Sequence, residues 1–483
     1  MNYKQVSSIL LLLFLLQTIT FSQEHPSIHQ VENDKYKVLP HRPSQFDPSG
    51  EGIIPLNTFK NRTPTSAVFG YFPYWKYPEF IQDMQFDLLS HIAVFDFSVL
   101  SNGNLSPPSA WPWTDFINEA HINGVKVILT AVNFNGSQIH QLLNDPDTKL
   151  NFFQQLKSTL QTYQLQGVNI DFENISYEDR GDVLNAFMAD LSTFLNNEIP
   201  GSELSIAVPP VNWGGWKFMG LAESCDYMFI MGYNFYGPWS ETSGACAPLT
   251  GGSYNMTNSL IYSFGEVANH YPEKLILGVP YYGNRWQTED GEAYSQVIDH
   301  TNQPTYSLAK NTSDDYGELW DDISQTTYCS YLESDNWYQI WYDSDSSLGL
   351  KYNLAESYNL KGIGMWALGY DSDKPELWDE IRRRYEGTSS VNDNSHNTID
   401  INLISSKTNH LLIDYTLNNR ADVSVFIINV SGQVIYQDFF GQSLSGRHRF
   451  NITTHLNSGI YILKLKSETK KGSEIATKKI FIR

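Results

Sequence analysis

Short apolar runs alternate with longer amphipathic segments between about residues 66 and 386 of the chain. Eight of these runs have the length and the β-branched or aromatic content of buried strands. They are Ala67–Phe72, His91–Phe97, Val125–Leu129, Gly167–Phe172, Leu204–Val208, Tyr227–Met231, Leu275–Val279 and Gly362–Trp366. Eight strands with helices between them, in about 320 residues, are what an α/β fold of the (β/α)8 TIM-barrel type requires. The structural alternative is a doubly wound open sheet.

The connections between these strands include one clear helix and one long insertion. After the fourth strand, apolar residues recur at helical spacing from Val183 to Leu195, and we expect Ser176 to cap this helix, with Asp179 three residues on. About 80 residues separate the seventh and eighth strands, which is too many for one helix. We therefore expect an inserted α+β lobe at about residues 284–355, overhanging one side of the barrel mouth.

The N-terminal part of the chain differs from the barrel. Lys4, an apolar run from Ile9 to Leu16 and small residues before a cut after Ser22 are typical of a secretory signal peptide, residues 1–22. This run is shorter than the roughly 18 residues that cross a bilayer, and no other stretch approaches that length, so no membrane span is expected. Residues 23–65 are polar and have no hydrophobic period, which favours a linker or an extended strap.

The C-terminal part begins with a polar linker, residues 387–397, and continues as a predicted small all-β sandwich, residues 398–483. The turns in Asn429–Val434 and Leu456–Tyr461 and the closing Lys478–Arg483 resemble the C-terminal sorting domain of type IX secretion cargo. This resemblance implies the type IX secretion machinery as a partner and a secreted or cell-surface location. An ancillary carbohydrate-binding or spacer module is the alternative.

Composition narrows the classes of function. The 483 residues contain 32 Lys and Arg against 53 Asp and Glu, and a net charge of −21 excludes nucleic-acid binding by general phosphate attraction. The chain lacks H-E-x-x-H, P-loop and G-x-S-x-G motifs, and no two of its three cysteines have C-x-x-C spacing. We expect no metal or organic cofactor, buried cysteines and a monomeric protein. Aromatic residues make up 14% of the chain, which is enough to form ligand-stacking surfaces.

Candidate chemistry lies on the fourth strand. Because side chains alternate along a strand, Asn169, Asp171 and Glu173 share one face, and the other face carries Val168, Ile170 and Phe172. The apolar face suits packing against helices, which leaves the polar face to the barrel lumen. A carboxylate pair at the carboxyl end of a barrel strand indicates catalysis. An ionised Asp171 makes ionisation of Glu173 harder, which favours Glu173 as a general acid. Taken alone, the triplet also fits a solvated, salt-bridged strand end.

The segment Gln166–Glu173 resembles the D-x-x-D-x-D-x-E signature of glycoside hydrolase family 18, the chitinase-like hydrolases. Further resemblances follow in the family's order, at Ala207–Pro210, Met231–Asn234, Leu277–Gly283, Trp341–Asp345 and Gly364–Leu368. Gln166, Asn169 and Asn234 stand where the family has aspartates. The reading G-V-N-I-D-F-E-N resembles the family's spore-cortex and peptidoglycan-associated branch.

The resemblance implies retaining, substrate-assisted hydrolysis of N-acetylglucosamine-containing glycans. Glu173 protonates the leaving oxygen, and the substrate's own acetamido oxygen attacks C1. Asp171 holds the acetamido N–H, and Tyr233 donates to the acetamido oxygen. The implied substrate-binding residues include Asn169, Asn234 and Met231, with Trp366 as the floor beneath the sugar. Further aromatic platforms are expected among Tyr71, Trp75, Trp213, Trp239 and Trp286.

The predicted function is therefore that of a secreted glycoside hydrolase cleaving β-1,4 bonds in chitin, chitooligosaccharide or peptidoglycan. Two alternatives remain at this point. One is a non-catalytic, chi-lectin-like glycan-binding barrel, which the replaced aspartates Gln166, Asn169 and Asn234 favour. The other is an endo-β-N-acetylglucosaminidase that acts on N-glycans.

Overall fold

A computed structural model describes most of the chain in two compact units, divided after Gly387. The described residues are 25–44, 47–58, 64–385, 399–407, 410–417, 421–429, 433–443, 446–453, 456–457, 459–469 and 472–482. The predicted signal peptide and the linker 387–397 lie outside these ranges.

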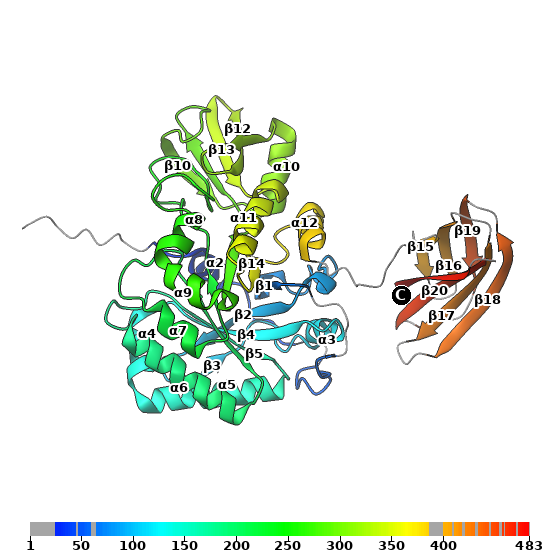
Figure 1. Ribbon diagram of the computed structural model, residues 1–483, viewed down its shortest axis with the longest axis horizontal. Coiled ribbons are helices and arrows are strands. Elements are labelled where there is room, and N and C mark those ends of the chain that lie inside the picture. Colours follow the sequence, from blue (N-terminus) through cyan, green and yellow to red (C-terminus); the bar gives the residue numbers. More distant parts are fainter. Residues whose placement is uncertain are drawn as a thin grey trace, which may run out of the picture. The chain divides into compact units, whose positions relative to one another are not determined.

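The larger unit is built on eight parallel strands that close into a barrel (Figure 1). They are β1 (Ala67–Pro73), β2 (His91–Val99), β4 (Lys126–Asn133), β5 (Gly167–Phe172), β6 (Glu203–Val208), β7 (Tyr227–Ile230), β8 (Leu275–Pro280) and β14 (Gly362–Trp366). The sheet closes because β1 pairs in parallel with both β2 and β14. The short strand β3 (Leu105–Ser106) pairs antiparallel with β2. The predicted TIM barrel is confirmed, and each of the eight predicted apolar runs is one of its strands.

Helices surround the barrel (Figure 1). They are α3 (Thr114–Ile122), α4 (Gly136–Asn144), α5 (Pro146–Thr162), α6 (Asp182–Glu198), α7 (Phe218–Ser224), α8 (Met256–Asn258), α9 (Gly265–His270), α11 (Asp345–Ser357) and α12 (Glu376–Tyr385), with short turns η1 (Tyr74–Lys76), η2 (Phe86–Leu88), η3 (Ser259–Ser263) and η4 (Pro272–Lys274). The apolar face of β5 packs outward as expected, since the Phe172 ring contacts Phe152 of α5 and Phe187 of α6.

The predicted start of the helix after β5 is wrong. We expected Ser176 to cap it, but α6 begins at Asp182 and Gly181 occupies the N-cap position. The Ser176 hydroxyl instead donates a hydrogen bond to the Asp179 carboxylate at 2.7 Å, inside a turn before the helix. The capping pattern therefore stabilises the turn that follows β5, and the helix starts one turn and a half later.

An insertion lies between β8 and β14. It contains β9 (Asn284–Thr288), β10 (Val297–Asn302), α10 (Tyr306–Tyr316), β11 (Leu319–Asp321), β12 (Thr326–Glu333) and β13 (Asn336–Tyr342). The five strands form one antiparallel sheet in the order β10-β9-β13-β12-β11. Trp286 and Trp341 are buried in a separate small cluster of this lobe. Trp286 therefore packs the insertion, and its proposed role as a sugar platform at the barrel mouth is wrong.

A helix near the N-terminus, α2 (Ile28–Tyr36), departs from the expected linker or extended strap. The Ser27 hydroxyl caps it by accepting from the Gln30 N–H. Only Ile28 of this helix is a buried apolar residue, which is why no hydrophobic period predicted it. After α2 the chain follows the outside of the barrel, where the Asp47 carboxylate accepts from Gly52 N–H and the Thr114 hydroxyl.

The smaller unit is all-β, as predicted. One sheet contains β15 (Ile399–Lys407), β16 (His410–Leu417) and β19 (Gly446–Ile452), and the other contains β17 (Ala421–Asn429), β18 (Val434–Ser443), β20 (Gly459–Thr469) and β21 (Gly472–Ile482). Side chains from both sheets, including Leu411, Ile413, Val425 and Leu463, form one hydrophobic core.

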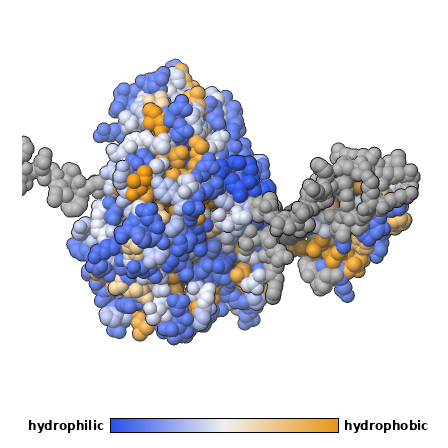
Figure 2. Space-filling view, in the orientation of Figure 1, coloured by the Kyte–Doolittle hydropathy of each residue, from blue (hydrophilic) through white to orange (hydrophobic). Residues whose placement is uncertain are grey.

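Hydrophilic residues cover most of the face of the larger unit drawn in Figure 2. No helix within the described ranges has the length and apolar character needed to cross a bilayer.

A buried ion pair joins the end of the insertion to α11. The Lys351 ammonium contacts the Asp343 carboxylate, and both side chains are almost wholly buried. The Ser347 hydroxyl donates to the same carboxylate oxygen at 2.7 Å. Removal of the cation leaves a buried carboxylate without its counterion, which is strongly destabilising.

We expect Lys351→Met to lower the free energy of unfolding of the larger unit by about 3 to 5 kcal/mol. All 12 tryptophans lie in this unit, so denaturant unfolding followed by tryptophan fluorescence reports on it selectively. The matched control is Lys217→Met, because Lys217 pairs with Asp182 on the exposed surface and its loss leaves stability nearly unchanged. Equal unfolding midpoints for both variants would contradict the prediction.

Candidate active site

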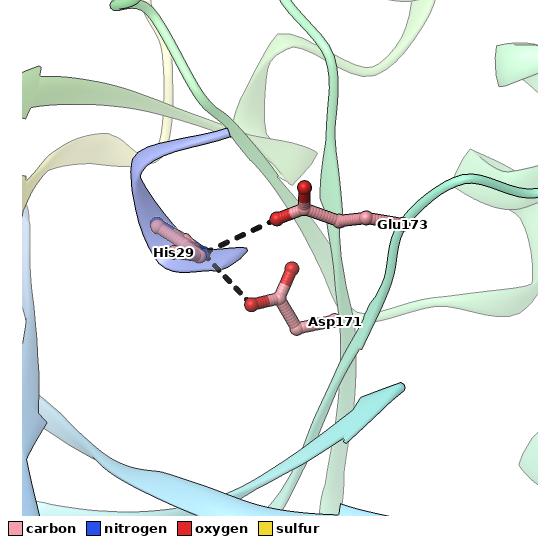
Figure 3. A group of neighbouring side chains, drawn as sticks. All are labelled: His29, Asp171 and Glu173. Atoms are coloured by element: carbon pink, nitrogen blue, oxygen red, sulfur yellow. Dashed lines mark hydrogen bonds and ion pairs between the residues drawn. The ribbon is translucent and has the colours of Figure 1, made fainter. Parts of the chain in front are cut away.

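Two carboxyl groups meet at the carboxyl end of β5. Asp171 is the penultimate residue of this strand, and Glu173 follows the strand directly. Figure 3 shows both side chains directed toward the imidazole of His29, which α2 carries. The Asp171 Oδ2 atom lies 2.7 Å from His29 Nδ1, and Glu173 Oε1 lies 3.7 Å from the same nitrogen. The structure thus brings the two predicted catalytic carboxyls together on the lumen side.

Asp171 is fully buried and only partly satisfied. Its Oδ2 atom contacts His29, whereas its Oδ1 atom is buried without a hydrogen-bond partner among the described residues. An orphaned buried acceptor costs free energy comparable to a lost hydrogen bond. This oxygen is therefore a ready acceptor for an N–H or O–H group of a ligand.

A neutral layer lies beneath Asp171. The Asn169 amide accepts from the Tyr71 hydroxyl at 2.8 Å and donates to the Ser205 hydroxyl at 2.9 Å, and all three side chains are fully buried. These bonds join β5 to its neighbouring strand β6 and to β1. Asn169 and Tyr71 therefore support the strand that presents Asp171, and neither contacts the open cavity described below.

Tyr233 faces Asp171 from the segment after β7. Its hydroxyl lies 2.7 Å from His29 Nε2. Burial, with a further contribution from the negative charges of Asp171 and Glu173, raises the pKa of Tyr233 well above its usual value. The phenol therefore keeps its proton and remains able to donate a hydrogen bond. Asn234, the next residue, accepts from the Tyr282 hydroxyl.

Trp366, which is predicted to form the floor beneath the sugar, is the last residue of β14. The Trp366 ring is fully buried, and the His29 imidazole stacks on it with centroids 3.8 Å apart. The Trp366 indole N–H donates to the Glu32 carboxylate at 2.8 Å. Both contacts come from α2, so this aromatic surface is covered by the chain's own N-terminal helix.

Other predicted platforms lie along the same mouth. Trp239 stacks on His25 with centroids 4.2 Å apart, and Trp75 stacks on Tyr36 with centroids 4.5 Å apart. Trp213 contacts the edge of Tyr254.

An open cavity of about 300 Å³ reaches Glu173 from one side. Its lining includes Trp213, Trp239, Met231, Tyr233 and Asn234, which were all predicted as site residues. Asp171 and Trp366 do not line this cavity, because α2 lies over them. The predicted residues are therefore divided into an open side around Glu173 and a covered side around Asp171.

The side chains of α2 are the part of the site that sequence reasoning missed. His29, Glu32, Asn33 and Tyr36 follow one another at helical spacing and form one polar and aromatic face. Each of the four contacts the barrel mouth. The helical spacing of these polar residues is visible in the sequence. A polar helix face usually points to solvent, however, so the spacing alone does not predict that α2 docks on the barrel.

Three groups at the mouth, His29, Asp171 and Glu173, have atoms within 4.8 Å of one another and donor types that a cation can use. In the structure, both ring nitrogens of His29 are within hydrogen-bond distance of protein groups: Nδ1 contacts Asp171, and Nε2 contacts the Tyr233 hydroxyl. Both ring nitrogens are thus engaged by neighbouring side chains.

Residues 67–371 match the sequence profile of glycosyl hydrolases family 18, which is more than half of the chain. The chain therefore belongs to this family of glycosidases, as the sequence motifs predicted. Human di-N-acetylchitobiase is 26% identical over 295 residues, which are 54% of this chain and 74% of that protein.

Solved structures confirm the fold. A family 18 chitinase from Cycas revoluta in complex with (GlcNAc)3 superposes with a TM-score of 0.59 at 17% identity, covering 66% of this chain and 99% of that one. The spore cortex-lytic enzyme SleL from Bacillus cereus gives 0.58 at 18% identity, covering 67% and 75%.

Residues 407–483 match the profile of the secretion system C-terminal sorting domain. The predicted sorting domain is thereby confirmed, and the protein is secreted or displayed at the cell surface.

Glu32 makes the docking of α2 depend on pH. Burial raises its pKa to about 7, although hydrogen bonds from Tyr370 and Trp366 and the charges of Lys35 and Lys76 oppose this rise. Because the docked carboxyl binds its proton more tightly than a free one, docking is strongest below about pH 4.5. It weakens as pH rises toward 7 and then levels off.

We expect hydrogen-exchange protection of the α2 amides, corrected for intrinsic rates, to fall by up to roughly 100-fold between pH 4.5 and 7.5. Glu32→Gln keeps an acceptor oxygen for Trp366 and Tyr370 and should make the fall in protection clearly smaller. Asp96, which accepts from Asn33 and whose pKa burial raises to about 6, accounts for the remainder. A wild-type protection that stays constant over this range would contradict the prediction.

Proposed function

We propose that the chain is a retaining glycosidase that cleaves β-1,4 bonds next to N-acetylglucosamine, using the substrate's own acetamido group as the nucleophile. The observation that carries this proposal is the pair of groups around the His29 ring. The Asp171 carboxylate and the Tyr233 hydroxyl each lie 2.7 Å from a ring nitrogen, one at Nδ1 and the other at Nε2. A secondary amide also presents one N–H and one acceptor oxygen, so the same two groups can hold an acetamido group.

In the proposed mechanism, Glu173 first protonates the glycosidic oxygen and the aglycone leaves. The acetamido oxygen attacks C1 as this bond breaks, which forms an oxazolinium ion with inversion at C1. Glu173, now a carboxylate, removes a proton from water, and this water attacks C1 and opens the ring with a second inversion. The net result is retention, and the chemistry needs one acid–base residue and no enzyme nucleophile.

Asp171 and Tyr233 act on the charge that develops during this step. The acetamido N–H donates to Asp171, whose negative charge stabilises the positive charge that spreads over the oxazolinium ion. Tyr233 donates to the acetamido oxygen and orients it toward C1. Asn169, which hydrogen-bonds Tyr71 and Ser205, places a neutral side chain beneath Asp171. Trp366 supplies the flat apolar surface beneath the sugar ring.

The substrate class is a polymer or oligomer that contains N-acetylglucosamine, either chitin and its oligomers or peptidoglycan. The names of the relatives support both, since they include a chitobiase, a chitinase and a spore cortex-lytic enzyme. Retention of Glu173 beside an open cavity favours an enzyme over a glycan-binding barrel without catalysis.

The central test replaces the proposed acid. Glu173→Gln cannot donate a proton and should lower kcat by at least about 100-fold on chitooligosaccharide or peptidoglycan, with reducing ends as the readout. Glu178→Gln is the matched control, because Glu178 is exposed in the same loop and should leave kcat unchanged. Equal turnover by wild type and Glu173→Gln would contradict the proposal. Saturable binding with no product from chitin, peptidoglycan or N-glycan would favour the glycan-binding alternative.

A second test removes the nucleophile from the substrate. Fully deacetylated glucosamine oligomers lack the acetamido group, so we expect no detectable cleavage of them at concentrations where the acetylated oligomer of equal length is cleaved. The measurement is product analysis by mass spectrometry after matched incubations. Comparable cleavage of the two oligomers would exclude substrate assistance and leave Glu173 as a simple general acid.

A further inference from the structure

We propose that residues 25–36 form an autoinhibitory plug that occupies the sugar-binding site, and that proteolytic cleavage of the exposed link at residues 38–41 activates the enzyme. The proposal rests on the proposed function in one respect, namely that the covered side of the mouth is the site for the N-acetylated sugar.

The imidazole of His29 occupies the position proposed for the acetamido group. It contacts Asp171 and Tyr233 through hydrogen bonds of 2.7 Å each, and it stacks on Trp366 at 3.8 Å. The ring is fully buried. A sugar cannot lie on Trp366 while the imidazole lies there, so binding of helix and substrate is mutually exclusive at this point.

The plug also contacts the proposed acid, Glu173. The Ser27 hydroxyl donates to Glu173 Oε1 at 2.6 Å. The amide of Asn174, the residue after Glu173, donates to the Gln30 side chain at 3.0 Å. Both contacts come from the start of α2, so the plug already hydrogen-bonds one carboxylate oxygen of the proposed acid.

The rest of the plug extends across the aromatic surfaces of the mouth. Tyr370 donates to Glu32 at 2.6 Å, and Asn33 donates to the buried Asp96 carboxylate at 2.6 Å. His25 lies on Trp239 at one end, and Tyr36 lies on Trp75 at the other. The helix thus uses hydrogen bonds and ring stacking, which are the interactions that a sugar chain can replace.

The helix adds little to the hydrophobic core of the barrel. Ile28 is its only buried apolar side chain, whereas its other buried residues, His29 and Glu32, are polar and face the site. A helix that served only to complete the core would bury an apolar stripe. The burial pattern of α2 therefore resembles that of a bound ligand.

The link after α2 is suited to cleavage. Residues 37–43 are exposed, and Val38 and Leu39 are 78% and 45% exposed. Beyond the link the chain is held to the barrel again, since Arg42 pairs with the backbone of Ala110 and the hydroxyl of Ser109. A cut at residues 38–41 would therefore free α2 and leave the following segment attached.

Cleavage would weaken the plug without altering any of its contacts. While the link is intact, the helix is present at the high effective concentration of a short tether. After the cut, it is a separate peptide that must bind as a second molecule. A helix of nine residues is also marginal in water, so the free peptide must refold when it binds.

The experiment places a recognition sequence for a site-specific protease between Val38 and Leu39 of the full chain. The cut protein is separated from its peptide by gel filtration. We expect kcat/KM on chitooligosaccharide to rise at least 10-fold over the uncut protein with the same insertion. A synthetic peptide of residues 25–37 should restore inhibition, and the same peptide with His29→Ala should inhibit at least 10-fold more weakly.

Binding separates this proposal from the proposed function. In the Glu173→Gln background, chitooligosaccharide affinity, followed by tryptophan fluorescence, should rise at least 10-fold on cleavage and peptide removal. Tighter binding after the cut without hydrolysis by the wild-type protein would support the plug and overturn the glycosidase. Equal affinity and equal turnover before and after peptide removal would overturn the plug and leave the glycosidase intact.

Variants of the uncut chain provide an independent check. His29→Ala with Glu32→Ala removes the contacts to Asp171, Tyr233 and Trp366 and should raise kcat/KM at least 5-fold without protease. The matched control is Asp34→Asn, because Asp34 is exposed on the opposite side of the helix and pairs only with Lys37 among the described residues. Its rate should equal that of wild type. Equal rates for the double variant and the control would contradict the plug.

Discussion

The buried carboxylate of Asp171 is the constraint on which the barrel mouth depends. A negative charge that is excluded from water is costly unless hydrogen-bond donors surround it. Its own strand cannot supply them, because the adjacent side chains Ile170 and Phe172 point to the helices. One donor comes from His29, and Oδ1 has none among the described residues. The site therefore requires a partner from outside the barrel strands.

Two kinds of partner satisfy this requirement. In the structure it is a polar helix from the N-terminal part of the same chain, and in the proposed reaction it is an acetylated sugar. Both place polar atoms between Asp171 and Tyr233 and lay a flat face on Trp366. The amide of Asn169 beneath them is neutral and adds no charge to the site. Its hydrogen bonds to Tyr71 and Ser205 satisfy both of its polar atoms.

The eight barrel strands and the lumen side of Asp171 and Glu173 could be predicted because they depend on short-range patterns. A run such as Gly167–Phe172 reveals a buried strand, and the alternation of side chains assigns each residue to a face. The turn at Ser176 was harder, since the same serine and acidic residue suit a cap or a turn. Trp286 was misplaced because a tryptophan near a strand end packs equally well in a lobe or in a cleft.

Local patterns were thus sufficient for the family, the barrel, the sorting domain and the candidate catalytic pair. The position of α2 required the folded chain. Several of its stabilising contacts join residues more than a hundred positions apart, such as His29 with Asp171 and Glu32 with Trp366. They are polar contacts, which leave no hydrophobic period in the sequence. Whether such a segment lies in solvent or in the mouth of the barrel is decided by the hydrogen-bond partners that the closed barrel presents to it.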